Sequence, residues 1–558
     1  MQNIISRMSV LGLAGLMLAS CAANQAIISK AQAELSEAQL IADIKALSAD
    51  EFGGRKPGQP GGPMTVDYLL RRVKEIGLQP GNGDSYLQQV KLQQVWTSAE
   101  SRIILTGGEK SITWKPFVDF AGRGPQPVPE ITLQCDGVII VGYGIADTAI
   151  GWDQFGDLDY TGKTVIIFRG DPIYFTKDST IYGGTPGRPV AFFSTKFANA
   201  RARGAVAAFI VLDANLSGSD FGWEQVAARG GGRRTVLDTE AEGEAPSLLT
   251  AYLSPESAAK LFATRGLSYQ ELLGEATKQT FEPIDLGYSL DLLMKMERDP
   301  FTSPNVLGLI RGRTRSDEIV MYTAHWDHVG TDTTLEGDQI FNGAADNASG
   351  TASLLTLATA FANLEEPPER SVLFLWVTAE ESGLLGSRYY ADHPVYPLAQ
   401  TVAALNIDML IPFGETRDVI VVGYGKSELD RYAERAAGKL GIYVQPDLWP
   451  EENFYFRSDH ISFARKGVPA LSMETGMDHV VDGQDSTLAR FSRWQAERYH
   501  KVADVFDDTW EMAGIMNYLR ISFDIGYTLS NQTRWPNWAK DDDFRAIRDA
   551  SRQAASSN

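Results

Sequence analysis

Residues 371–387, SVLFLWVTAEESGLLGS, join an unbroken apolar run to two acids and a turn that contains glycine. The run from Val372 to Val377 does not alternate with polar residues, which predicts a strand that is buried on both faces. Strands of this kind occur in parallel sheets that helices cover on both sides. We therefore expect a buried strand that ends just before Glu380 and Glu381.

The sequence around this stretch alternates strand and helix patterns from Pro304 onward. Apolar runs recur as EIVMYTA (318–324), TVAALNI (401–407) and DVIVVGYG (418–425), and amphipathic patterns recur as TASLLTLATAFANL (351–364) and SELDRYAERAAGKLG (427–441). This alternation predicts an α/β fold with a mostly parallel mixed sheet flanked by helices.

Chemically reactive side chains follow the ends of three of these strands. His325 and Asp327 follow EIVMYTA, and Asp408 follows TVAALNI. Glu380 and Glu381 follow the apolar run from Val372 to Val377. Because ligands of open α/β sheets bind beyond the carboxyl ends of the strands, we expect these side chains to meet. Imidazole and carboxylate groups suit zinc, and the shortage of cysteines excludes a thiolate site.

A tight, glycine-punctuated turn, NGAADNASG (342–350), holds a lone acid, Asp346. By itself the turn predicts a loop and a helix cap, with Ser349 as the capping residue. The strand-end residues have equally plain alternatives as solvated loops, acidic turns or helix caps. Their joint occurrence, with all six histidines beyond residue 304, favours a site in which two metals share one carboxylate.

Residues 304–510 resemble the M28 family of zinc peptidases, which includes di-zinc aminopeptidases and glutamate carboxypeptidases. The resemblance is carried by HWD (325–327), AADNASG (344–350), TAEESGLLGS (378–387), NIDM (406–409) and RYHKVAD (498–504). It implies two Zn²⁺ ions bridged by one acid, and a cis peptide bond after that acid. The implied metal ligands are His325, Asp346, Glu381, Asp408 and His500, with Asp346 as the bridge.

The resemblance also implies roles for three residues that bind no metal. Asp327 orients His325, and Glu380 is the general base that removes a proton from a water held between the metals. His460, in SDHISFARKGVPAL (458–471), takes the place of a transition-state donor. The implied activity is that of a di-zinc exopeptidase of the aminopeptidase type, which removes N-terminal residues from short peptides.

Other activities stay open at this point. A carboxypeptidase of the glutamate-releasing kind would use the same ligands, and a non-catalytic, receptor-like relative would have lost them. A glutaminyl-cyclase-like enzyme binds one metal, which the joint presence of His325 and Asp408 opposes. The sequence does not distinguish the preferred side chain, the attacked terminus, the native metal or the oligomeric state.

Other parts of the chain predict further segments. Residues 131–284 resemble a protease-associated (PA) domain in VGYGI (141–145), DLDYTGKTVIIFRGDP (157–172) and KFANARARGA (196–205). We expect this β-rich insert to form a lobe over the zinc cleft and, having no histidine, to supply no metal ligand. Residues 21–130 should pack with the peptidase domain at 285–540, and residues 541–558 should form a frayed polar tail.

The N-terminus has the pattern of a bacterial lipoprotein signal peptide at residues 1–20. Arg7 precedes an apolar run from Met8 to Leu18, which is too short to span a bilayer, and Ala19-Ser20 leads into Cys21. We expect lipidation of Cys21 to tether the exported protein to a membrane, and Ala22 favours the outer membrane, facing the periplasm. The net charge of −20, without a Lys/Arg-rich block, argues against nucleic acid as a partner.

Overall fold

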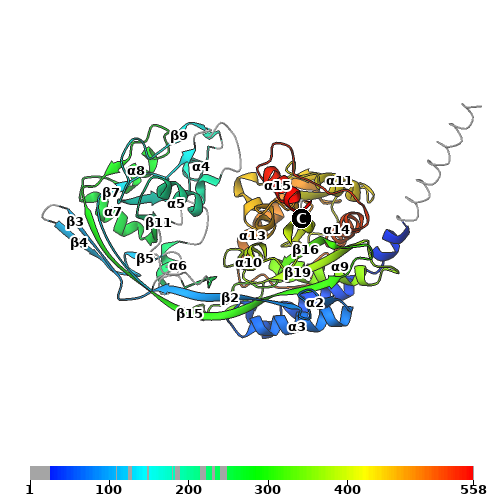
Figure 1. The fold of residues 1–558 in the computed structure, drawn as a ribbon. Helices are drawn as coiled ribbons and strands as arrows, with labels where there is room; N and C mark the ends of the chain where they lie inside the picture. The colour runs from blue at the N-terminus through cyan, green and yellow to red at the C-terminus, as the bar shows by residue number, and fades with distance from the viewer. Residues whose placement is uncertain are drawn as a thin grey trace, which may run out of the picture. The chain divides into compact units, whose positions relative to one another are not determined.

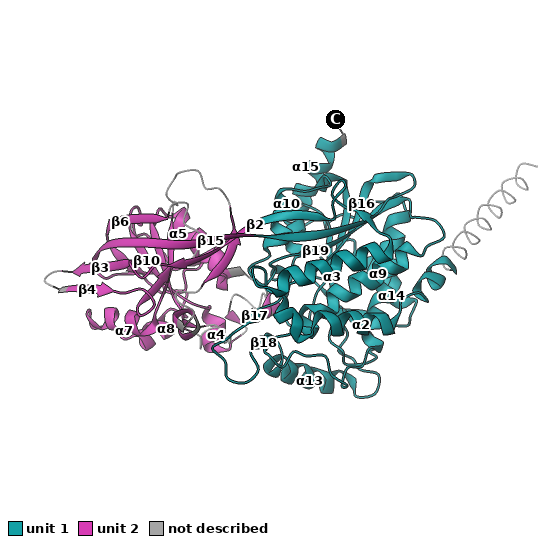
Figure 2. Ribbon diagram, turned by 90° about the horizontal axis from the view of Figure 1, so that it is seen from below, with its two compact units in different colours: residues 1–90, 302–449, 454–558 teal, residues 91–301, 450–453 magenta. Residues whose placement is uncertain are grey.

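The computed structural model describes two compact units of one chain (Figure 2). Unit 1 comprises residues 1–90, 302–449 and 454–558, and unit 2 comprises residues 91–301 and 450–453. The described residues are 26–107, 110–122, 129–147, 150–178, 180–181, 189–213, 222–228, 233–238 and 248–556. The expected signal peptide and Cys21 lie outside them. Within these ranges no helix has both the length and the hydrophobicity needed to cross a membrane.

A mixed, mostly parallel sheet forms the centre of unit 1. Its strands are, in spatial order, β15 (Ser289–Ile310), β19 (Arg370–Val377), β16 (Arg315–His325), β20 (Thr401–Ile407), β23 (Ala470–Thr475), β21 (Asp418–Val422) and β22 (Tyr443–Pro446). β19, β16, β20 and β23 run parallel, whereas β15 is antiparallel to β19, and β21 is antiparallel to β23. Only the part of β15 from Thr302 onward belongs to this unit. The arrangement confirms the predicted fold class.

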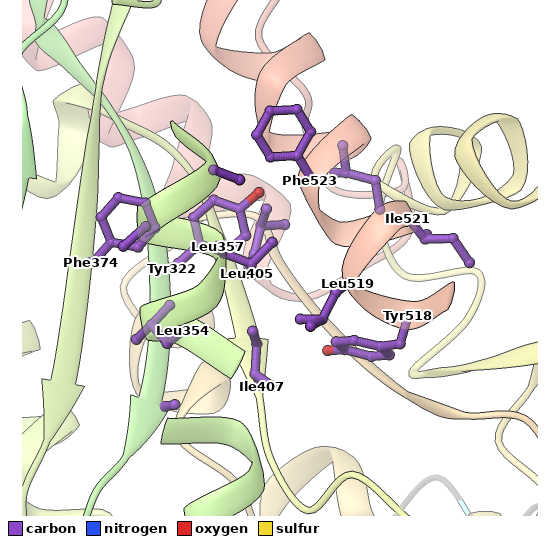
Figure 3. Close-up of a cluster of buried hydrophobic side chains, with 14 of the residues drawn as sticks. Tyr322, Leu354, Leu357, Phe374, Leu405, Ile407, Tyr518, Leu519, Ile521 and Phe523 are labelled. Carbon is purple, nitrogen blue, oxygen red and sulfur yellow. The ribbon is translucent and has the colours of Figure 1, made fainter. Parts of the chain in front are cut away.

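Helices cover both faces of this sheet, as the unbroken apolar strands predict. In β16, Val320 and Tyr322 belong to one hydrophobic core, whereas Ile319 and Met321 belong to a core on the other face. Figure 1 shows α9 and α14 beside β16 and β19, and Figure 3 shows side chains of these helices packed against Tyr322. The helices are α2 (Glu37–Leu47), α3 (Gly61–Ile76), α9 (Gly350–Ala362), α10 (Leu385–Asp392), α11 (Asp430–Gly438), α12 (His460–Ala464), α13 (Gly483–Glu497), α14 (Ala513–Asn531) and α15 (Phe544–Ser556).

Helices α2 and α3, near the N-terminus, are part of unit 1 and pack against α9. A 3₁₀ turn, η1 (Asp50–Arg55), connects α2 to the loop before α3. The glycine- and proline-rich stretch 53–63 runs into the first turn of α3, which begins at Gly61. The main chain of Phe52 passes so close to Gly61 that any Cβ there would overlap the Phe52 carbonyl. Glycine at position 61 therefore allows the main chain of Phe52 to approach the start of α3 closely.

The C-terminal residues are folded, which corrects the expectation of a frayed tail. Residues Phe544–Ser556 form α15, and Arg548 of this helix is 2% exposed. Its guanidinium donates to the carbonyl oxygens of Leu398 (3.2 Å) and Thr401 (2.7 Å). A polar sequence is thus ordered because one long cationic side chain satisfies main-chain acceptors inside unit 1.

Unit 2 has a sheet of its own with a parallel centre. Strands β7, β10, β11 and β13 run parallel, and β14 and β5 pair antiparallel at the two edges. The unit extends beyond the expected insert limits of 131 and 284, because β3 and β6 pair with the part of β15 that follows Ser289. The strands of the six-stranded sheet are β14 (Ile284–Asp285), β7 (Val138–Ile140), β10 (Thr164–Phe168), β11 (Ala207–Val211), β13 (Leu249–Leu253) and β5 (Phe120–Gly122).

Unit 2 also contains further strands and several helices. Other strands are β3 (Arg102–Gly107), β4 (Lys110–Trp114), β6 (Glu130–Asp136) and β12 (Arg234–Leu237). The helices are α4 (Pro172–Thr176), α5 (Phe193–Ala202), α6 (Trp223–Ala228), α7 (Pro255–Ala263) and α8 (Tyr269–Glu275). The expectation that this part of the chain covers the zinc cleft stays a prediction.

One lysine of α5, Lys196, is wholly buried in unit 2. Its ammonium group donates to the carbonyl oxygen of Tyr143 and lies 5.7 Å from the centre of the Tyr143 ring. Burial lowers the pKa of Lys196 to about 7, although the nearby carboxylate of Asp171 acts in the opposite direction. The unit therefore holds a cation whose protonation is linked to folding near neutral pH.

Candidate metal centre

Three neighbouring parallel strands deliver the expected ligands to one pocket. β16 ends at His325, β19 ends just before Glu380 and Glu381, and β20 ends just before Asp408. His325 is paired with Val377, so the ends of β16 and β19 are level. A pocket of about 390 Å³ lies at this edge, and its lining includes His325, Asp346, Glu380, Glu381, Asp408 and His500. The structure therefore brings together the six residues for which the sequence predicts metal binding or proton transfer.

Asp346 lies between two histidines that come from distant parts of the chain. Its Oδ1 is 3.3 Å from Nε2 of His325, and its Oδ2 is 3.0 Å from Nε2 of His500. The acid sits in a single π-helical turn, η6 (Ala344–Ser349), directly before α9, and its peptide bond to Asn347 is cis. Since each oxygen faces a different histidine, Asp346 is placed as a bridging ligand would be.

The plain alternative for this turn, a helix cap by Ser349, is not what the structure contains. The Ser349 side chain makes no capping hydrogen bond to α9. It donates to the carbonyl oxygen of Ala345 (2.7 Å) and accepts from the amide of Leu410 (3.0 Å). The serine thus ties the turn to the segment that follows β20, next to Asp408.

Two groups of ligand atoms share Asp346. In the first, Nε2 of His325 lies 3.1 Å from Oδ1 of Asp408. In the second, Oε2 of Glu381 lies 3.2 Å from Nε2 of His500. One ligand atom from each of His325, Asp346 and Asp408 lies within 4.8 Å of the others, and the same holds for His328, Asp346 and Glu381. Each group has three ligand atoms close enough together to hold one cation.

The second group has two histidines, His328 and His500, of which only His500 is predicted from the sequence. His500 presents Nε2 to both Asp346 and Glu381, whereas Nδ1 of His328 lies 2.6 Å from Oε1 of Glu381. We therefore take His500 as the ligand and His328 as the residue that orients Glu381. The repeated histidine in HWDH (325–328) is the signal that sequence reasoning could have used.

The donor set fits zinc. Imidazole nitrogens and carboxylate oxygens are usual zinc ligands. Among the described residues that line the pocket, Arg457 is the only lysine or arginine beside five acids, Asp346, Glu380, Glu381, Asp408 and Glu474. Burial opposes a charge on His325, but Asp408 and Glu380 outweigh it and raise its pKa well above the usual value. This surplus of negative charge would be costly to bury without bound cations.

Glu380 and Glu381 occupy different environments although they are adjacent. Both Glu381 oxygens face imidazole nitrogens, those of His328 and His500. No hydrogen bond holds the Glu380 carboxylate to any residue that the structure describes, so it is free to face the pocket. Burial, and then the negative charges of Asp408 and Glu381, raise the pKa of Glu380 well above its usual range. One acid is thus placed to bind a metal and the other to exchange a proton.

Asp327 is close to His325, but its side chain holds a different group from the one expected. Nδ1 of His325 lies 3.1 Å from the main-chain oxygen of Asp327 and 3.9 Å from its Oδ1. The wholly buried carboxylate instead accepts the amide of Glu380 at 3.0 Å. The orientation of His325 therefore comes from the Asp327 main chain, while the Asp327 side chain positions the segment that bears Glu380.

Two further buried residues, which sequence reasoning missed, hold the turn that carries Asp346. Asp504 accepts from the amides of Ala345 (3.0 Å) and Asp346 (3.1 Å). Arg55 is 1% exposed and donates to main-chain oxygens of Trp326 (3.0 Å) and Gly343 (2.7 Å). Asp504 lies four residues after His500 in RYHKVAD, whereas nothing in the sequence near Arg55 points to the site.

The donor role expected for His460 has no support in the geometry. His460 is wholly buried at the start of α12, and both ring nitrogens lack a hydrogen-bond partner among the described residues. Burial lowers its pKa to about 4. The residues just before it, Arg457 and Ser458, line the pocket instead, and Ser458 donates to Oδ2 of Asp408 at 2.5 Å. The segment is thus at the site, but His460 points into the core.

Comparison with known proteins places this centre in a family. Residues 305–521 match the model of peptidase family M28. The chain is 27% identical over 264 residues to leucine aminopeptidase 2 of Arthroderma otae, covering 45% of this chain and 50% of that protein. It is 31% identical over 274 residues to leucine aminopeptidase 2 of Trichophyton equinum, covering 47% and 51%. The chain thus spans about half the length of these curated relatives.

A solved structure supports the fold. The aminopeptidase from Aneurinibacillus sp. strain AM-1 superposes with a TM-score of 0.50 at 18% identity, over 91% of this chain and 97% of that one. At this identity the likeness speaks for the fold alone. The strand-end ligands all lie within residues 305–521, the stretch that matches the model of peptidase family M28.

Proposed function

We propose that this chain is a zinc aminopeptidase that uses two metal ions to remove N-terminal residues from short peptides. The observation that carries the proposal is the position of Asp346, whose two oxygens face histidines of two ligand groups. When bound, zinc ions would polarise the scissile carbonyl and lower the pKa of water toward about 7. The curated relatives are named as aminopeptidases, which supports the choice of terminus.

The chain's own residues have separate tasks in this proposal. His325, Asp408, Glu381 and His500 would hold the metals, with Asp346 shared between them. Glu380, whose carboxylate has no hydrogen-bond partner among the described residues, would accept a proton from the attacking water at its Oε and pass it to the departing amine. His328 would hold Glu381 through its Nδ1, and Asp327 would hold the main chain of Glu380.

Substitution of the two adjacent acids tests the division of roles. General-base catalysis contributes roughly 10²- to 10⁴-fold, so Glu380→Gln should reduce kcat by that factor while the zinc content stays unchanged. Glu381→Gln should lose metal together with activity. Zinc content and turnover are measured on the same preparations. If Glu380→Gln loses zinc and Glu381→Gln does not, the roles are reversed, and if neither slows turnover, the centre is not catalytic.

One observation favours a second candidate, a carboxypeptidase. Arg457 lines the pocket, and a guanidinium is well suited to bind the terminal carboxylate of a peptide. Dipeptides blocked at either end separate the two candidates. An aminopeptidase should cleave a dipeptide amide but not an N-acetyl dipeptide, and a carboxypeptidase should do the reverse.

Membrane attachment through Cys21 is a further part of the proposal. It is supported by the lipoprotein-like sequence that ends at this cysteine. Replacing Cys21 with alanine should release the protein from the membrane fraction of an expressing bacterium. Continued sedimentation of Cys21→Ala with membranes would refute the anchor.

A further inference from the structure

An acid that the proposed mechanism does not use, Glu474, lines the same pocket. It lies on β23, which pairs in parallel with β20 and has Met473 opposite Ile407. Glu474 is the next residue along β23, as Asp408 is the next residue along from β20. Neighbouring strands lie about 4.8 Å apart, and residues opposite each other project to the same face. The register thus places Glu474 beside the first group of metal ligands.

The surroundings of Glu474 form one wall of the pocket. Ser472, two residues earlier on β23, also lines the pocket, as expected because alternate residues of a strand share a face. Val422 of β21 is paired with Ser472 and lines it too. Phe454 and Phe456, in the 3₁₀ turn η9 (Phe454–Phe456), also line the pocket and add apolar surface to it.

No cation of the chain compensates Glu474 among the residues that the structure describes. The one arginine of the lining, Arg457, lies over the ring of Phe454 at 5.2 Å and acts electrostatically on Tyr499 rather than on Glu474. Glu474 is half-buried, and carboxylates with limited access to water are normally paired or bound to a cation. A cation that enters the pocket could therefore pair with the Glu474 carboxylate.

A purely structural role would explain this acid poorly. No hydrogen bond from the Glu474 carboxylate to a described residue holds the strands together, so an apolar side chain would serve packing better. Position and charge together suit a substrate group that brings its own positive charge. The apolar wall of Val422, Phe454 and Phe456 suits the methylene stem of a lysine or arginine side chain.

We propose that Glu474 is a specificity residue that binds the cationic side chain of the first residue of the substrate, so that peptides beginning with lysine or arginine are preferred. The inference rests on the proposed aminopeptidase function. The curated relatives are named as leucine aminopeptidases. The preference proposed for this chain is different, because a leucine side chain would leave the Glu474 carboxylate without a partner.

The test compares substrates that differ only in the terminal charge of the side chain. kcat/KM is measured for the p-nitroanilides of lysine, arginine, norleucine and leucine, norleucine being the lysine stem without its ammonium group. The wild-type protein should prefer lysine and arginine. Since a charge-assisted hydrogen bond contributes about 1.5–3 kcal/mol, Glu474→Gln should reduce kcat/KM for these two substrates by roughly 10- to 100-fold. Norleucine and leucine should change little.

Two controls separate this effect from a general loss. Glu415→Gln makes the same chemical change at an exposed position outside the pocket and should leave every substrate unchanged. The zinc content of Glu474→Gln should equal that of the wild type. An equal loss on all four substrates would overturn the inference, because it would mean that Glu474 binds the α-ammonium group or supports the fold. Cleavage of leucine but not lysine by the wild type would overturn it while leaving the aminopeptidase function intact.

A binding measurement makes the inference independent of turnover. Calorimetry compares lysine amide with norleucine amide on the zinc-loaded Glu380→Gln variant, which should not hydrolyse either. Lysine amide should bind more tightly, and the double variant Glu380→Gln/Glu474→Gln should lose that difference. If the protein hydrolyses nothing but this difference holds, the proposed function fails and the cation site stands. If the two amides bind equally, the cation site is refuted.

Discussion

Replacing Arg55 with methionine should destabilise unit 1 and empty the metal centre together. Arg55 is 1% exposed, and its guanidinium donates to four main-chain oxygens, those of Leu47, Trp326, Asn342 and Gly343. Trp326 directly follows His325, and Gly343 lies three residues before Asp346. One side chain thus fixes the two segments that carry these ligands to the end of α2.

The size of the effect can be worked out from these contacts. Leaving a buried carbonyl without its partner costs about 1–3 kcal/mol. Four such carbonyls together cost roughly 4–8 kcal/mol, below the upper sum because most of these carbonyls can shift and recover part of the loss. Burial lowers the pKa of Arg55 to about 10, a shift that corresponds to about 3 kcal/mol regained when the charge is removed. The net loss is roughly 1–5 kcal/mol, a large fraction of the stability of a domain.

Urea denaturation followed by tryptophan fluorescence measures the stability, and zinc content measures the site. Arg55→Lys keeps the positive charge but loses the planar arrangement of N–H donors. Its stability and zinc content should therefore lie between those of the wild type and Arg55→Met. Arg71→Met removes an exposed arginine of α3, whose side chain is 56% exposed, and should change stability by less than about 0.5 kcal/mol. If Arg55→Met unfolds at the same urea concentration as the wild type and retains zinc, the anchoring role is wrong.

Three more changes probe the centre and unit 2. His328→Leu should weaken binding of one zinc by roughly 10- to 100-fold in a chelator competition, since groups that orient a ligand typically contribute that much. His328→Gln should restore part of the lost zinc affinity. An unchanged affinity in His328→Leu would exclude the orienting role. Removing zinc with a chelator should abolish hydrolysis and lower the unfolding midpoint, because a ligand of the native state stabilises that state. Added zinc should restore both the activity and the midpoint. Activity that survives full removal of zinc would contradict a metal mechanism. Between pH 7 and 10.5 the unfolded chain keeps the Lys196 proton while the folded chain loses it, so stability should rise with pH by up to about 1.4 kcal/mol per unit. Lys196→Met should lack this rise, unlike Lys260→Met at an exposed site, and equal slopes in both variants would show that Lys196 is not the group.

The metal ligands could be predicted because each follows a strand whose burial is visible in the sequence. His325, Glu381 and Asp408 stand where apolar runs end, and parallel strands bring such ends to one edge. Ligands from loops needed more than periodicity: Asp346 and His500 were found through their family motifs.

Groups whose contacts depend on the tertiary structure could not be predicted in this way. Arg55 reaches Trp326 across 271 positions of sequence, and no local pattern encodes that contact. Glu474 lies beside Asp408 only because β23 pairs with β20, although β21 and β22 come between them in the chain. The assignment of His460 failed for a related reason, since the start of a short helix can turn one residue to the pocket and the next into the core.

The order in which the chain is synthesised gives the division into units a biological consequence. Unit 2 is almost a single stretch of sequence, Lys91 to Phe301, whereas unit 1 combines residues from both sides of that stretch. During synthesis, α2, α3 and Arg55 are made before β16 and α9, while unit 2 can complete its own sheet in the interval. Until then the apolar residues of α2 and α3 lack their contacts with α9. Factors that shield nascent hydrophobic helices should therefore matter most for the segment that contains α2 and α3.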